Sequence, residues 1–260
     1  MRRHGPPRRE DYESAVLPIW SELLAGVEFG FLAISPVNLG YGIPHGDGSG
    51  VVLVPCFLGT DFFLTQFRSW LRRIGYQPYY SGIRVNAECP NLLIQQYLRT
   101  AIEEAYKSTK RKIHVVGHSL GGTMARAAAA QSPDRVASVI TLGAPIQGLV
   151  GHPAVMRTAA LVRKQILKRH GPRVLPGCYT EHCTCSFIES LMGKFPKSVR
   201  QTAIYSKSDG MMDWRVCRTG DPRVDVEVTS THLGFVCNPL VYKVVAERLA
   251  GCGPSTPVAP

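Results

Sequence analysis

Short apolar runs alternate with longer amphipathic stretches along most of this chain. Residues 51–54, 113–116, 136–142 and 202–205 are short and largely apolar, as are strands buried on both faces of a parallel sheet. Between such runs, apolar residues recur at helical spacing, for example over 91–107. This alternation predicts an α/β protein with a mostly parallel central sheet and helices on both faces.

Two stretches depart from this alternation. Residues 10–33 predict a leading amphipathic helix, which we expect to pack on the domain, with a membrane-surface helix as the alternative. Residues 148–198 insert a predicted helix at 153–170, a turn rich in glycine and proline, and a short helix near 187–192. The chain is therefore expected to form one domain with an insertion.

The strand at 113–116 is followed by Gly117-His118-Ser119-Leu120-Gly121 and then by an alanine-rich helical stretch. This G-x-S-x-G pattern, placed between a strand and a helix, is typical of a nucleophilic serine on a sharp turn. The turn brings backbones close together, so Gly117 and Gly121 carry no side chain. We therefore predict that Ser119 is a catalytic nucleophile.

A serine hydroxyl is a weak nucleophile and needs a base. His232 is the only histidine that follows a late predicted strand and comes after every candidate acid. In the serine–acid–histidine order that accompanies G-x-S-x-G, it would take the Ser119 proton and return it to the leaving group. Asp209 follows the strand at 202–205 and is the preferred acid, with Asp213 as its competitor.

An oxyanion formed in such a reaction needs two preorganised donors. We predict that one is the backbone N–H of Leu120, directly after the nucleophile. The other is expected from the loop after the first central strand, where the N–H of Phe57 is the best match. Phe57, Ser119, Asp209 and His232 all follow predicted strands, and the carboxyl ends of parallel strands meet at one edge of a sheet.

Composition and charge narrow the class of protein. The 260 residues are 45% hydrophobic and 19% charged, as in a globular chain with a sizeable core, and the net charge is +11. The basic residues gather in an N-terminal tail and within 157–173. Because no nucleic-acid motif accompanies them, we favour a solvated basic face over a nucleic-acid site.

The cysteines and the chain ends add few constraints. Eight cysteines permit disulfides without fixing their pairing, and the spacing at 181–185 lacks the second ligand pair of a zinc site, so no metal or cofactor is expected. No apolar run of about 18 residues predicts a membrane span, and acidic residues make the N-terminus unlike a signal peptide. Cytoplasmic location and secretion after leader removal both stay open. Residues 1–9 and 251–260 are expected to be disordered tails.

Five motifs in this order resemble the α/β-hydrolase superfamily, in particular its bacterial lipase and esterase branch. They are residues 51–59, 117–122, 141–148, 205–210 and 231–234. Each is weak alone, and their joint order and spacing make the resemblance specific. The chain departs from the family at Pro55-Cys56, where members commonly carry His-Gly.

The resemblance implies the α/β-hydrolase fold and hydrolysis of carboxylic esters through an acyl-enzyme, without a catalytic metal. By position, residues 148–198 resemble the family's variable cap or lid. Their apolar side chains are expected either to line an acyl channel or to form ordinary cap core. Leu58, Phe62 and Ile146 are expected to contact an apolar acyl group.

Three functions follow for this set of residues. The leading one is a lipase-like carboxylester hydrolase acting on esters of apolar acids. An acyltransferase with an alcohol acceptor is the second, and a non-catalytic lipid-binding protein on the same fold is the third. The expected partner is an acyl ester or lipid, with peripheral contact at a membrane or lipid interface left open and no nucleic acid.

Overall fold

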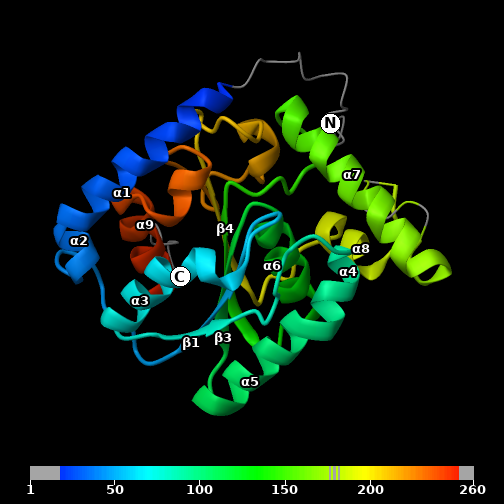
Figure 1. The fold of residues 1–260 in the computed structure, drawn as a ribbon. Helices are drawn as coiled ribbons and strands as arrows, with labels where there is room; N and C mark the ends of the chain where they lie inside the picture. Colours follow the sequence, from blue (N-terminus) through cyan, green and yellow to red (C-terminus); the bar gives the residue numbers. More distant parts are fainter. Residues whose placement is uncertain (1–17, 176, 178–179, 181, 252–260) are drawn as a thin grey trace, which may run out of the picture.

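A six-stranded parallel sheet forms the centre of the molecule, in the order β2-β1-β3-β4-β5-β6 (Figure 1). The computed structural model describes residues 18–251 except 176, 178, 179 and 181. The strands are β1 (Gly50–Val54), β2 (Gln77–Tyr80), β3 (Ile113–His118), β4 (Val136–Leu142), β5 (Arg200–Tyr205) and β6 (Asp225–Glu227). The α/β class and the parallel sheet predicted from the apolar runs are confirmed.

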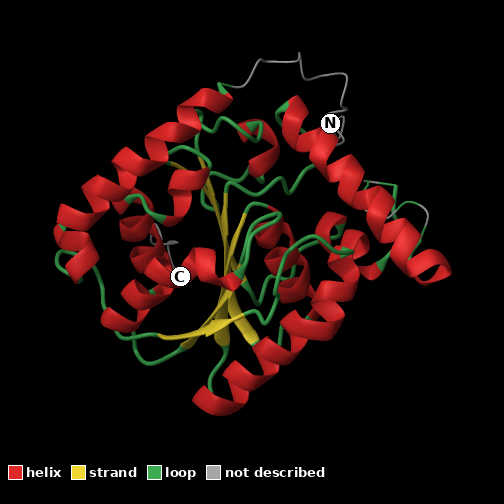
Figure 2. Ribbon diagram, in the orientation of Figure 1, coloured by secondary structure: helices red, strands yellow, loops and turns green. Residues whose placement is uncertain are grey.

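Helices cover both faces of this sheet (Figure 2). One face carries α1 (Ala25–Ile34), α3 (Thr65–Arg73) and α9 (Pro239–Leu249), and the other carries α4 (Pro90–Leu93), α5 (Arg99–Thr109), α6 (Leu120–Gln131) and α8 (Ser186–Met192). Side chains alternate along β1, so Val52 and Val54 enter one buried cluster while Val51 and Leu53 enter the other. Burial on both faces explains why the strands are almost continuously apolar.

Several shorter elements complete the described chain. They are η2 (Ile19–Leu24), α2 (Pro36–Leu39), η3 (Asp61–Leu64), η4 (Ile94–Leu98), α7 (Pro153–His170), η5 (Gly171–Arg173), η6 (Trp214–Cys217) and η7 (Leu233–Val236). The short helix α2 follows α1 directly and is capped by Ser35. The single helix expected at 91–107 is divided into α4, the π-helical η4 and α5.

The leading helix was expected at residues 10–33, of which 10–17 lie outside the described residues. The described part forms η2 and α1, which pack on the domain with the opposite face from the one that the apolar spacing predicts. Trp20 is 71% exposed, and Val27 and Phe31 are also exposed, whereas the carboxylates of Glu22 and Glu28 point inward and accept hydrogen bonds from distant loops. The prediction of an inward apolar face was wrong because these hydrogen bonds decide the orientation.

The predicted insertion contains the two expected helices, α7 and α8. Helix α8 packs on α6, while α7 lies outside the sheet-and-helix layers on the α8 side (Figure 1). The role of residues 148–198 as a cap on a single domain stays a prediction.

None of the helices in the described ranges is both long and apolar enough to cross a bilayer. The tails expected at 1–9 and 251–260 lie outside the described residues, apart from Gly251.

Candidate active site

The turn between β3 and α6 holds Ser119 in an unusual backbone conformation, with φ 54° and ψ −126°. A Cβ atom at Gly117 would collide with the carbonyl oxygen of Gly121. A Cβ atom at Gly121 would collide with the carbonyl oxygens of Val54 and Pro55 at the end of β1. Both glycines are therefore required for the strained turn that carries the serine hydroxyl.

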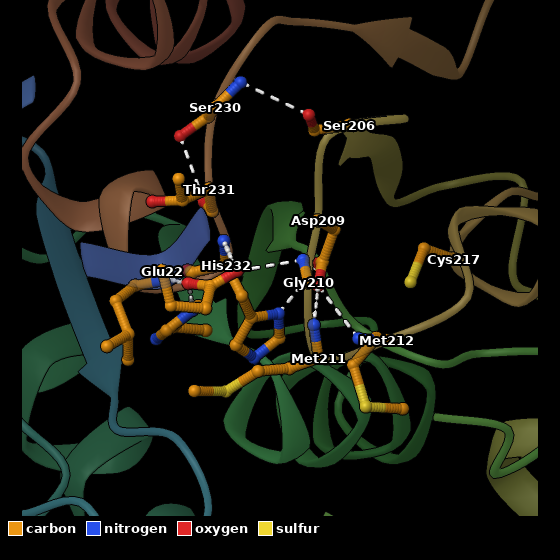
Figure 3. Close-up of polar contacts among 12 residues, drawn as sticks. Glu22, Ser206, Asp209, Gly210, Met211, Met212, Cys217, Ser230, Thr231 and His232 are labelled. Atoms are coloured by element: carbon orange, nitrogen blue, oxygen red, sulfur yellow. Dashed lines mark hydrogen bonds and ion pairs between the residues drawn. The ribbon is translucent and has the colours of Figure 1, made fainter. Parts of the chain in front are cut away.

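His232 lies after β6 and contacts the carboxylate of Asp209, which follows β5. The imidazole Nδ1 donates to Asp209 Oδ2 at 2.7 Å, and both side chains are buried (Figure 3). The other carboxylate oxygen accepts the N–H groups of Met211 and Met212 at 2.8 and 2.7 Å. Because Nδ1 holds its proton toward Asp209, Nε2 is left to act as a base.

Asp213 has a different partner. Its carboxylate forms an ion pair with Arg215 at 2.6 Å and caps η6 by accepting the Arg215 N–H. The structure therefore brings Asp209, and not Asp213, against the His232 ring.

Two buried histidines at the site have opposite pKa shifts. Burial by itself would lower the pKa of His232, but the charge and hydrogen bond of Asp209, with the charge of Glu22, raise it above the ordinary value. Burial, with the charge of His232, lowers the pKa of His118 well below its ordinary range. The neutral His118 ring donates from Nε2 to the His232 carbonyl oxygen at 2.9 Å and supports the histidine turn.

Ser119 and His232 line one cavity, together with Phe57, Leu58 and Met212 among other residues. No hydrogen bond joins Ser119 Oγ to the His232 ring in this structure. Such contacts are commonly long until a substrate is bound. Cys56 also lines the cavity, but burial raises the pKa of its thiol to about 11, so it is not a thiolate at neutral pH.

Asn86 holds the loop that carries the expected oxyanion donor. Its side chain donates to the Pro55 carbonyl oxygen at 2.8 Å, and its backbone pairs with Leu58 N–H and with the Gly59 carbonyl oxygen, each at 2.9 Å. Leu58 has a positive φ of 59°, and Asn86 is fully buried. Phe57 lies inside this braced turn. No sequence motif marks Asn86, because it contacts the loop only in the folded chain.

A second, apolar cavity leads from Ser119 toward α7 and α8 and has a volume of about 120 Å³. This is several times the space that one water molecule needs, about 10–15 Å³. Val155, Met156 and Ala159 of α7 line it, as does Leu191 of α8. The segment predicted as a cap thus contributes side chains directly beside the serine.

The comparisons with known proteins agree with this architecture. A family model described as alpha/beta hydrolase fold matches residues 94–215. The mature lipase BlEst2 of Bacillus licheniformis superposes with a TM-score of 0.54 at 15% identity, over 80% of this chain and 94% of that one. This chain has the α/β-hydrolase fold. The family resemblance predicted from the five motifs is confirmed.

Further proteins similar to this chain are lipases and esterases. The carboxylesterase CesB (YbfK) of Bacillus subtilis superposes with a TM-score of 0.51 at 12% identity, over 89% of this chain and 99% of that one. A triacylglycerol lipase of Burkholderia plantarii is 29% identical over 156 residues, which are 57% of this chain. The matched part covers 42% of that lipase, so the hydrolase spans less than half the length of this curated relative. At these identities the solved structures show a shared fold.

The residues expected to bind an acyl group lie in three different places. Leu58 lines the cavity that contains Ser119 and His232. Phe62 is 83% exposed, and Ile146 is buried in the core beside the sheet. Neither Phe62 nor Ile146 lines either of the two cavities that contain Ser119.

The apolar residues of the predicted cap also lie in different places. Leu149, Val155 and Met156 line the apolar cavity of the hydrolase. Val162 and Ile166, on the other hand, form a buried cluster with other residues near α7. Part of the segment therefore lines the cavity beside Ser119 and part forms buried core, and the binding of an acyl group in that cavity stays a prediction.

Within the described ranges, Cys56, Cys183, Cys185, Cys217 and Cys237 are free thiols. Cys178 and Cys252 lie outside the described residues. Over the same described ranges, no group of three or more histidine, cysteine, aspartate or glutamate side chains is placed to hold a metal ion.

Proposed function

We propose that this α/β hydrolase is a serine carboxylester hydrolase that cleaves esters of apolar acids through an acyl-enzyme at Ser119. The observation that supports it most directly is the shared cavity of Ser119 and His232, where His232 is hydrogen-bonded to the buried Asp209. A strained serine, a base and an orienting carboxylate are the groups that this chemistry needs.

In the first half-reaction, His232 Nε2 takes the Ser119 hydroxyl proton while Oγ attacks the ester carbonyl carbon. The carbonyl oxygen becomes an oxyanion, and the N–H groups of Phe57 and Leu120 are proposed to stabilise it. The intermediate collapses, the bond to the alcohol oxygen breaks, and His232 returns the proton to the departing alcohol. The acyl group stays on Ser119.

In the second half-reaction, His232 removes a proton from a water molecule, which attacks the acyl carbon. The bond to Ser119 Oγ breaks, Oγ recovers the proton and the carboxylic acid leaves. The apolar cavity beside Ser119, lined by α7 and α8, suits the acyl chain, and its lining supports an apolar acid as substrate.

Replacing the nucleophile tests this proposal. Ser119→Ala should lower the hydrolysis of p-nitrophenyl esters by on the order of 10⁶-fold, as expected when a triad nucleophile is lost. A fluorophosphonate probe should label the wild type and fail to label this variant. Ser108→Ala changes an exposed serine on α5 and is the matched control. Equal hydrolysis by Ser119→Ala and the wild type would rule out the proposed nucleophile.

The same assay separates the two alternatives. If ester products exceed the free acid when glycerol is added, the acyl-enzyme passes its acyl group to alcohols and the protein is an acyltransferase. If the wild type neither hydrolyses esters nor reacts with the probe, the fold acts as a non-catalytic lipid-binding protein.

We further propose that the protein contacts a lipid interface through η2 and α1. The exposed side chains of Trp20, Leu23, Val27, Phe31 and Ile34 support this role. Apolar side chains gathered on one helical face favour the boundary between water and lipid. The net charge of +11 favours anionic lipid over neutral lipid.

A further inference from the structure

A buried carboxylate from the N-terminal segment lies between the two loops that carry Asp209 and His232. Glu22 Oε1 accepts the N–H of Gly210 at 2.8 Å and the N–H of His232 at 2.9 Å. Its Oε2 accepts the N–H of Leu233 at 2.8 Å. Figure 3 shows this side chain directed at both loops. Glu22 is 6% exposed, and all three donors are backbone groups.

The geometry around Gly210 fits this arrangement. A Cβ atom at Gly210 would lie 2.9 Å from Glu22 Oε1 and 2.8 Å from the Pro18 carbonyl oxygen. Gly210 does not have a positive φ. The glycine is therefore required by the close approach of the N-terminal segment.

Glu28, two turns further along, contacts the same histidine loop at other points. Its carboxylate accepts the N–H of Thr231 at 2.7 Å, the hydroxyl of Ser230 at 2.8 Å and the side-chain amide of Asn238 at 3.0 Å. None of these groups belongs to His232 or to the Asp209 loop. Glu28 therefore anchors the loop, whereas Glu22 joins the two loops.

Three charged or titratable side chains act on His232 from separate elements. Asp209 after β5 forms the ring hydrogen bond, His118 at the end of β3 supports its carbonyl oxygen, and Glu22 of η2 adds a negative charge. Glu28 of α1 lies one residue away along the loop, at Thr231. The charge of Glu22 acts in the same direction as that of Asp209 and favours the protonated imidazole.

We propose that Glu22 is a positioning residue, which holds the Asp209 loop and the His232 loop in a fixed mutual placement through one carboxylate. The N-terminal segment is then part of the apparatus that sets the base, although it contacts no substrate. This role rests on the proposed esterase function. It matters because a displacement of about 1 Å in a catalytic group can reduce the rate on the order of 10²-fold.

Glu22→Gln is the direct test. The amide keeps the shape but turns a donor toward one of the three N–H groups and removes the charge. We expect kcat for p-nitrophenyl esters to fall on the order of 10- to 100-fold with KM changed by less than about twofold. The acid limb of the pH–rate profile should move to lower pH, because the lost charge no longer raises the pKa of His232.

Two glutamates serve as controls. Glu28→Gln weakens the same loop without touching His232, so it should lower the melting temperature while leaving the acid limb in place. Glu104→Gln changes an exposed residue on α5 and should leave kcat, the pH profile and the melting temperature unchanged. If Glu22→Gln behaves like Glu28→Gln, Glu22 has only a structural role and the proposal is wrong.

A readout that needs no activity keeps this test separate from that of the esterase function. Titration of the His232 imidazole by NMR should give a lower pKa in Glu22→Gln than in the wild type, and an unchanged value overturns the proposal even if no ester is hydrolysed. If Glu22→Gln does not fold, Glu22→Asp is the second variant to be measured. It keeps the charge but is one methylene too short, so kcat should fall while the acid limb stays near that of the wild type. Wild-type kcat in Glu22→Asp also overturns the proposal.

Discussion

At the scale of single residues, the proposed proton transfer depends on where Asp209 directs its two oxygens. One accepts from the His232 ring, and the other is held by two N–H groups of its own turn. The carboxylate therefore cannot rotate away without losing backbone hydrogen bonds. Burial lowers the pKa of His232, but the charge and hydrogen bond of Asp209, together with the charge of Glu22, outweigh this effect and raise the pKa of that ring. A protonated imidazole, which forms during each half-reaction, is thereby stabilised.

Asp209→Asn should lower kcat by on the order of 10³- to 10⁴-fold, because a neutral amide neither stabilises the imidazolium nor selects the required tautomer. Steady-state hydrolysis of a p-nitrophenyl ester measures this loss, and circular dichroism checks the fold. Asp213→Asn breaks the ion pair with Arg215 instead and should keep kcat within about tenfold. A larger loss of kcat in Asp213→Asn than in Asp209→Asn would show that Asp213, and not Asp209, is the acid.

At the scale of elements, η2 and α1 turn carboxylates toward the protein and large apolar side chains toward solvent. Their inward face offers carboxylates to the backbone of the catalytic loops, and their outward face offers Trp20, Phe31 and other large apolar side chains to solvent. An exposed apolar face of this kind is unfavourable in water and favourable at a lipid boundary. The same helix is therefore proposed to serve both the site and the interface.

The double variant Trp20→Ser, Phe31→Ser should lower binding to vesicles of phosphatidylcholine and phosphatidylglycerol at least tenfold, since each lost apolar side chain contributes roughly 1.5–3 kcal/mol on burial. Cosedimentation measures the binding. Leu161→Ser alters an exposed leucine on α7 and should bind as the wild type does. Unchanged vesicle binding by the double variant would contradict the lipid proposal. If the wild type is a dimer and the double variant is a monomer, the exposed apolar face binds a second copy of the chain instead of lipid.

At the scale of the whole molecule, the candidate site combines loops that follow strands of the sheet with side chains of the segment 148–198. The serine turn and the Phe57 loop follow β3 and β1, and side chains of α7 and α8 line the cavity that is proposed to hold the acyl chain. The size of the acyl group that fits should therefore depend on residues of the predicted cap, such as Ala159, and not on the sheet.

Ala159→Phe should lower kcat/KM for p-nitrophenyl octanoate on the order of tenfold or more while changing the acetate ester by less than about twofold, because the new ring fills space needed by a long chain. A chain-length series of esters measures the preference. Ala160→Phe adds the same ring to the neighbouring exposed position on α7 and should leave the series unchanged. Equal losses on short and long esters would show that the cavity does not hold the acyl chain.

Much of the fold and the order of the site residues could be predicted because they depend on local rules. Apolar runs identify strands buried on both faces, and the serine turn needs glycine at 117 and 121 wherever it occurs. The choice of Asp209 over Asp213 was already favoured by its place after a strand. The proposed substrate contacts were harder to predict. Phe62 follows the Phe57 loop and Ile146 follows β4, but neither lines a cavity that contains Ser119.

The sequence by itself determined the parallel α/β architecture and the serine turn, because each depends on residues a few positions apart. Only the tertiary structure decided which face of η2 and α1 is buried, and that Asn86 and Glu22 brace the loops of the site. Amphipathic spacing marks two faces of a helix but does not say which is inside. A buried carboxylate is stable only where N–H donors converge on it. Those donors come from loops far along the chain, which the fold alone brings to Glu22.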